Sequence, residues 1–149
     1  MPTIEVRSQV FGGHQDSPSL KPILLNILQE RLSVAELIQR SVEEQIRELL
    51  VQRQMDAQQV RRVLDRHYLT AAEIAAQAQQ GAIRYPSERV TQVPQIDRRS
   101  EIKKALRAFE VGSYIILVNS QQVESLDEEL TLSLNTKVIF LRLMPLVGG

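Results

Sequence analysis

The N-terminal segment alternates apolar and polar residues with the period of a half-buried β-strand. Ile4 and Val6 alternate with Glu5 and Arg7, which places the two apolar side chains on one face. A second apolar run, 23–28, follows a stretch rich in turn-forming residues. The two runs predict a β-hairpin with a long loop.

The clearest helical signal begins at Ser33. Ser33 and Glu36 form a capping box, in which the serine hydroxyl accepts a backbone N–H while the glutamate reaches back toward the cap. Apolar residues then recur every three or four positions, so one stripe of the predicted helix faces a core. This stripe consists of Val34, Leu37, Ile38, Val42, Ile46, Leu49 and Leu50.

Helical patterns also run through the middle of the chain. After residue 51 the helical period continues or restarts near Asp56. A second capping box, with Thr70 as the cap and Glu73 as its partner, predicts an alanine-rich helix that Gly81 ends.

A third helix start is indicated at Asp97. The carboxylate of this residue is a suitable N-cap, and Gly112 is a suitable end for the helix that follows. The period of the segment predicts the inward-facing residues Ile102, Leu106 and Phe109.

After the third helix the period changes to that of strands. A nearly continuous apolar run, 114–118, leads into the turn pair Asn119 and Ser120 and a short return through Val123. A further strand is predicted at 130–134.

The last predicted strand, 137–143, is apolar on both faces. Ile139, Leu141 and Leu143 alternate with Val138, Phe140 and Arg142. A strand of this kind needs cover on its second face as well, which either the middle helices or a partner must supply.

The order of elements predicts the α+β class, with a mixed sheet packed on the helix that begins at Ser33. Removing residues 51–110 would leave a β-β-α-β-β unit. A chain of 149 residues is about the size of one domain. We therefore expect a single domain over 1–149, with a helical insertion at about 51–110.

Charge and hydropathy narrow the expected partners. The chain has 18 Lys and Arg against 18 Asp and Glu, so neither nucleic acid nor a membrane surface is an expected partner. No run approaches the roughly 20 apolar residues that span a bilayer, and no secretory signal precedes the first strand, which predicts a soluble cytoplasmic protein. The arginines of 53–66 are interspersed with Asp56 and Asp65, which favours a solvated helix face over a nucleic-acid interface.

The chain offers little for metal or nucleophilic chemistry. It contains no cysteine, which excludes a thiolate nucleophile and a Cys-ligated zinc site. His14 and His67 stand in different segments, with no spacing that would place two ligands on one helical face. We expect no metal, no cofactor and no catalytic residue, and hence no enzyme.

The two ends of the chain carry a resemblance to a known family. The final strand followed by the tail Pro145, Leu146, Val147, Gly148 and Gly149 resembles the ubiquitin-like modifiers, and most closely the small sulfur carriers of thiamine and molybdopterin synthesis. The N-terminal hairpin and the helix start at Ser33 are similar to that family too. The resemblance covers roughly the first fifty and last forty residues and implies a β-grasp (ubiquitin-like) fold.

The resemblance implies the role of the tail. Gly149 would be the residue whose carboxylate is adenylated and then conjugated, and Pro145, Leu146, Val147 and Gly148 would be recognised as the tail. The implied partners are an adenylating activating enzyme, a conjugating enzyme, a deconjugating protease and a target protein. The expected function is that of a bacterial ubiquitin-like modifier.

Two other functions fit the same sequence. A sulfur carrier would bear a thiocarboxylate at Gly149, and a non-covalent β-grasp binding module would use its inserted helices while its tail is inert. A Gly-Gly end is by itself weak evidence, since a frayed terminus has the same composition. Its position after Pro145, at the exit of an apolar strand, favours the modifier or the carrier.

Overall fold

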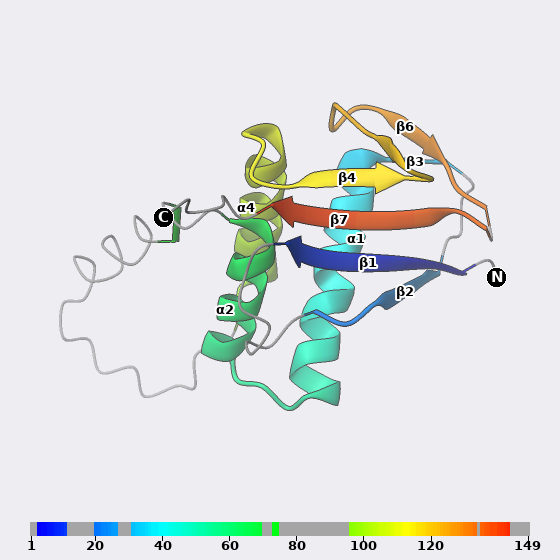
Figure 1. Cartoon of the computed structure of the whole chain (residues 1–149). Coiled ribbons are helices and arrows are strands. Elements are labelled where there is room, and N and C mark those ends of the chain that lie inside the picture. The colour runs from blue at the N-terminus through cyan, green and yellow to red at the C-terminus, as the bar shows by residue number, and fades with distance from the viewer. Residues whose placement is uncertain are drawn as a thin grey trace.

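The chain folds into a mixed five-stranded β-sheet with helices packed on one of its faces (Figure 1). This computed structural model describes residues 3–11, 20–26, 31–69, 73–74, 96–133 and 135–143. The strand order β2-β1-β7-β4-β5 makes β1 and β7 neighbours at the centre of the sheet. The strands are β1 Thr3–Phe11, β2 Ile23–Asn26, β4 Ile115–Val118, β5 Gln121–Gln122 and β7 Lys137–Leu143.

The central strands present one continuous apolar surface. β1 runs parallel to β7, whereas β2 is antiparallel to β1 and β4 is antiparallel to β7. Val6 lies beside Val138, and Ile116 lies beside Phe140, with all four side chains buried. Ile4 is buried on the same face as Val6, which confirms the alternation predicted for β1. The mixed sheet and its helices confirm the α+β class.

Helix α1 (Val34–Arg47) covers this surface and lies behind the strands in Figure 1. It begins where the capping box predicts, because the Ser33 hydroxyl accepts the N–H of Glu36 at 3.1 Å. A π-helical segment, η1 (Glu48–Gln52), continues it. The predicted apolar stripe is confirmed, since its first members are each at most 1% exposed: Val34, Leu37, Ile38, Val42 and Ile46.

Two more helices are α2 (Ala57–Tyr68) and α4 (Arg98–Glu110). α4 begins at the start signal predicted at Asp97, and α2 shows that the helical pattern restarts at Asp56 and does not continue unbroken. The Asp56 carboxylate accepts the N–H of Gln59 at 2.8 Å, and the Gln59 side chain accepts the N–H of Asp56 at 3.0 Å. The Asp97 carboxylate accepts a backbone N–H three residues further on at 3.3 Å. α4 packs against both α1 and α2.

The inward face of α4 is broader than the predicted one. Phe109 is buried as predicted, and Ile102 and Leu106 are partly buried and pack against the core. Ala105 and Ala108 occupy the buried centre of this face. Small side chains at a contact allow two helices to approach closely, so the two larger side chains lie at the margin of the contact.

The hairpin between β4 and β5 confirms the predicted turn. Asn119 and Ser120 have φ values of 51° and 68°, the left-handed conformation that a tight type I′ turn requires. The strand predicted at 130–134 corresponds to a shorter strand in the structure, β6 (Glu129–Thr131). It pairs with β3 (Arg31–Ser33) in a separate two-stranded sheet.

Part of the middle segment lies outside the described ranges. Of the helix predicted from Thr70 to Gly81, the structure describes Glu73 and Ile74, and both are helical. The assignment of 51–110 to an insertion stays a prediction.

The packing of α1 gives a direct stability prediction. Leu37 is fully buried, so Leu37→Ala should lower the free energy of unfolding by about 2–5 kcal/mol through lost burial and a cavity. Gln39→Ala on the exposed side of the same helix is the matched control and should change it by less than about 0.5 kcal/mol. Urea unfolding measures both, and equal effects would contradict the described orientation of α1.

Candidate functional site

The tail residues predicted to carry function lie outside the described part of the chain: Pro145, Leu146, Val147, Gly148 and Gly149. The last described residue is Leu143, which ends β7. β7 is paired on both sides, in parallel with β1 and antiparallel with β4. The surroundings of β7 are therefore the described structure nearest to the tail.

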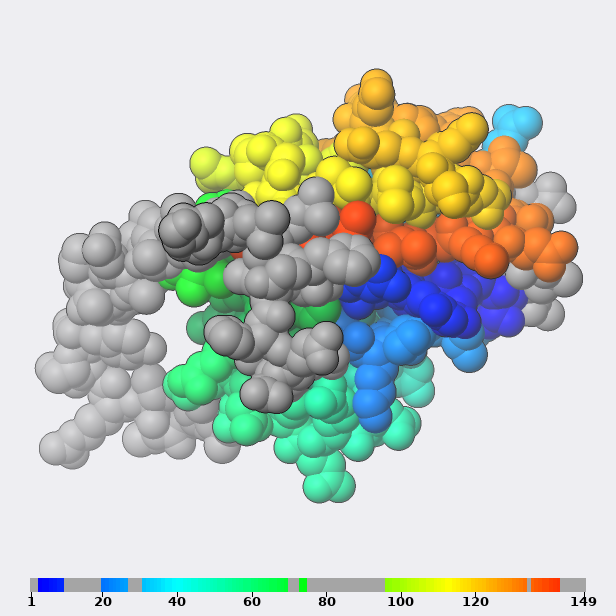
Figure 2. Space-filling model, viewed as in Figure 1, coloured from blue at the N-terminus to red at the C-terminus, as the bar shows by residue number. Residues whose placement is uncertain are grey.

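The outer face of the sheet carries an apolar patch across β4 and β7. Ile139 is paired with Leu117, and Leu141 is paired with Ile115. All four residues are half-buried and form what we call the outer patch. Figure 2 shows the strands of this face at the surface of the molecule.

The described helices lie on the opposite face of the sheet. From α1, the Gln45 amide donates to the Ser8 hydroxyl at 3.0 Å, and from α2 the Tyr68 ring contacts Phe140 at a centroid distance of 6.1 Å. Tyr114, which follows α4 in the sequence, stacks on Phe140 and contacts Phe109 of α4. The last strand was expected to be covered on its second face by either inserted helices or a partner. Of the inserted helices, α2 and α4 do not provide this cover at the outer patch.

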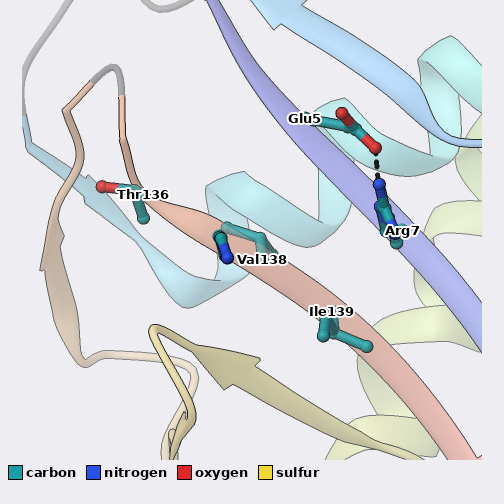
Figure 3. A pocket seen from close by; sticks show the side chains of 6 residues that line it. Glu5, Arg7, Thr136, Val138 and Ile139 are labelled. Atoms are coloured by element: carbon teal, nitrogen blue, oxygen red, sulfur yellow. Dashed lines mark hydrogen bonds and ion pairs between the residues drawn. The ribbon is translucent and has the colours of Figure 1, made fainter.

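A hollow of about 300 Å³ adjoins the outer patch between β1 and β7 (Figure 3). Its lining residues are Glu5, Arg7, Thr136, Lys137, Val138 and Ile139. Glu5 and Arg7 form an ion pair of 2.6 Å with half-exposed side chains, which contributes little to stability but fixes two charges beside the patch. A charged rim around an apolar centre is typical of a protein recognition surface.

On the inner face, a polar network lies beneath β1. The Tyr68 hydroxyl donates to the Gln45 side-chain oxygen at 2.6 Å, while the Gln45 amide donates to Ser8. Burial raises the pKa of Tyr68 far above its ordinary value, although the bond to Gln45 opposes this shift. Tyr68 is therefore neutral and acts as a hydrogen-bond donor that links α2 to α1.

Arg142, near the end of β7, is buried on this same inner face. It is 3% exposed, and its Nη1 donates to the Arg66 carbonyl at 3.3 Å. Among the residues that the structure describes, its Nε has no hydrogen-bond partner. The alternation of β7 already placed Arg142 on one face with Val138 and Phe140, but its burial and its contact with α2 were not predicted.

His67 lies in the last turn of α2 and is buried. Its Nε2 accepts the N–H of Leu20 at 3.1 Å, so the ring proton is assigned to Nδ1, which is buried and has no partner within the described ranges. Burial lowers the pKa of His67, the charges of Arg66 and Arg142 act in the same direction, and together they bring it to about 4. The imidazole is neutral at neutral pH.

A cluster of charges joins α2 to α4. The Lys104 ammonium contacts Asp65 at 3.1 Å and Glu101 at 3.0 Å, and Arg61 contacts Glu101 at 3.4 Å. Burial raises the pKa of Glu101, while Lys104 and Arg61 oppose the shift. Arg61, within the arginine-rich segment, thus has a structural partner.

Within the described ranges, no three His, Asp or Glu side chains are grouped in a way that could hold a metal ion, and no helix there is long and apolar enough to cross a membrane. Comparison of the chain with protein-family models, curated proteins and solved structures finds no match.

The buried neutral His67 predicts a loss of stability in acid. Its pKa falls from 6.5 to about 4 on folding. Between pH 6.5 and pH 4, His67 is therefore mostly protonated in the unfolded chain and mostly neutral in the folded one. Stability should therefore fall as the pH drops below 6.5, by about 3 kcal/mol at pH 4 from this group.

The matched variant is His67→Gln, which keeps an acceptor for the N–H of Leu20 but does not titrate. Carboxylates titrate in the same pH range in both proteins, so the difference between them isolates His67. Urea unfolding at pH 7 and pH 4 should show the larger loss in the wild type. An equal loss in both proteins would exclude a neutral, buried His67.

Proposed function

We propose that this chain is a bacterial ubiquitin-like modifier with a β-grasp fold, whose Gly149 carboxylate is adenylated by an activating enzyme and conjugated to a target protein. The observation that carries the proposal is the position of β7. This strand is central, lies parallel to β1, and ends at Leu143, two residues before Pro145. The tail would continue directly from the best-held strand of the sheet.

The arrangement of the sheet supports the β-grasp part of the proposal. A β-β-α-β-β core with a mixed sheet on one helix corresponds to the hairpin β1-β2, helix α1 and the strands β4 and β7. α2 and α4 lie between α1 and β4 in sequence, as an insertion into such a core would.

The tail has the chemistry that activation needs. The Gly149 carboxylate would attack the α-phosphorus of ATP, forming a mixed anhydride with AMP and releasing pyrophosphate. A thiolate or amine would then attack the Gly149 carbonyl and release AMP. Gly148 and Gly149 have no Cβ, so an extended tail could enter a narrow channel with its carbonyl open to attack. Pro145 disfavours continuation of the strand and so starts the tail.

The outer patch supports recognition of the body as well as the tail. Its four residues are apolar, half-buried and left uncovered by α1, α2 and α4. We assign this patch and the adjoining hollow to contact with the activating enzyme. The deconjugating protease would approach the same side, since both enzymes act on the carboxyl group of Gly149: the activating enzyme on the free carboxylate, and the protease on its bond to the target.

The same adenylate would also serve a sulfur carrier, in which a sulfide displaces AMP and leaves a thiocarboxylate on Gly149. The tail alone fits either function. The middle segment favours the modifier, because a minimal carrier needs no additional helices such as α2 and α4.

Intact-mass spectrometry after incubation with an adenylating enzyme from the same genome and ATP tests the proposal. We expect an AMP adduct on the chain or a thioester between the chain and the enzyme. Deletion of Gly149 should abolish both products. Ile139→Lys in the outer patch should lower the kcat/KM of the activating enzyme for adenylation of the chain by about tenfold or more, while the chain remains folded.

Gln39→Lys, on an exposed position of α1, is the control for the added charge. Absence of any adduct at Gly149 would refute the proposal. A mass increase equal to the exchange of one oxygen for sulfur would identify a sulfur carrier instead. If the chain keeps its full activity in the cell after deletion of both Gly148 and Gly149, the tail is inert and the chain is a non-covalent binding module.

A further inference from the structure

Arg142 is a buried cation at the point where β7 approaches its end. It lies on the face that carries Val138 and Phe140, yet it is a guanidinium with only 3% of its surface exposed. Only Leu143 follows it in the strand. The side chain extends into the layer between the sheet and α2, where it donates to the carbonyl of Arg66.

The end of α2 is an appropriate partner for this cation. The last four carbonyl groups of a helix lack donors within the helix and carry a partial negative charge. The Arg66 carbonyl belongs to this turn, and the Leu69 N–H closes the helix on Asp65. Burial lowers the pKa of Arg142, but the carboxylate of Glu73 counteracts this shift and favours the charged form.

Stability alone does not account for a guanidinium at this position. Removing the charge from water is costly, and Nε finds no hydrogen-bond partner in the described part of the chain. An apolar side chain of similar size often gives equal or greater stability at such a site. What an apolar residue cannot supply is a directional bond from the strand to the last turn of α2.

We propose that Arg142 is a positioning residue for the C-terminal tail: it fastens the end of β7 to α2, so that the tail leaves the sheet at a fixed point and in a fixed direction. This inference rests on the proposed function. α2 and Glu73 both belong to the segment 51–110, which is predicted to be an insertion. The middle segment thereby acquires a role, because it presents the tail to the activating enzyme.

A fixed strand end improves recognition by raising the fraction of molecules that are ready to bind. The apparent affinity of a partner falls in proportion to the fraction of molecules in the competent conformation. Loosening the end of β7 should therefore raise KM for the chain, whereas kcat should not change once the tail is seated. A purely structural role would leave KM unchanged in a folded variant.

Hydrogen exchange tests the anchor itself, without any enzyme. In Arg142→Met we expect the backbone amides of Leu141 and Leu143 to exchange about tenfold faster or more, while that of Val138 is unchanged. The midpoint of urea unfolding should stay equal or rise. Unchanged exchange at Leu141 and Leu143 would overturn the anchor.

The kinetics of adenylate formation, with the enzyme used above, test the positioning role. Arg142→Met should raise KM for the chain by about tenfold at constant kcat, and Arg142→Lys, which keeps a charged donor, should stay within about threefold of the wild type. Arg47→Met, an exposed arginine at the end of α1, is the control and should match the wild type. An unchanged KM in Arg142→Met would overturn the proposal.

The two measurements separate this inference from the proposed function. If the wild type forms no adenylate, the proposed function fails and the positioning role fails with it, while exchange still decides the anchor. If Arg142→Met does not fold, amide hydrogen exchange in the wild type tests whether the end of β7 is anchored to α2. Leu141 and Leu143 should then exchange as slowly as Phe140, and exchange as fast as that of the exposed Gln122 would overturn the anchor.

Discussion

The placement of β7 between β1 and β4 is the constraint on which the other features of the molecule depend. The strand contributes Val138 and Phe140 to the core, and burying side chains of this kind is worth about 1.5–3 kcal/mol each. A shift of one residue in its register would turn these side chains outward and Ile139 inward. The register with β1 and β4 therefore fixes both the composition of the core and the point at which the chain leaves the sheet.

The two faces of β7 connect different parts of the molecule. The inner face passes from apolar residues to Arg142, and Phe140 on this face contacts Tyr68 at the end of α2 and Tyr114, which lies between α4 and β4. Tyr68 and Tyr114 lie edge to face with centroids 4.9 Å apart, and the Tyr114 hydroxyl donates to the carbonyl of Ala105 at 2.8 Å. The outer face carries the half-buried apolar residues of the outer patch. One strand thus links the middle helices, the core and the proposed recognition surface.

Local sequence signals predicted the elements more completely than their partners. Period-two alternation identified β1, and the start signals at Ser33 and Asp97 identified two helix starts, because these signals depend on neighbouring residues alone. The helical period left open whether the helix continues or restarts near Asp56, and the structure shows a restart with Asp56 as the cap. The pairing of β6 with β3 depends on residues about a hundred positions apart. The contact of Arg142 with α2 also spans 76 positions, and no local pattern encodes it. The tail prediction rests on family resemblance and lies beyond the described residues.

The proposed conjugation through Gly149 would leave a specific signature in a tryptic digest. No lysine or arginine follows Arg142, so trypsin releases the segment from Leu143 to Gly149 as one peptide. In digests of proteins from cells that express the chain and the proposed activating enzyme, we expect target peptides whose lysine amine carries this segment through an isopeptide bond. A digest that contains the segment only as a free peptide, with no target peptide attached, would refute conjugation through Gly149.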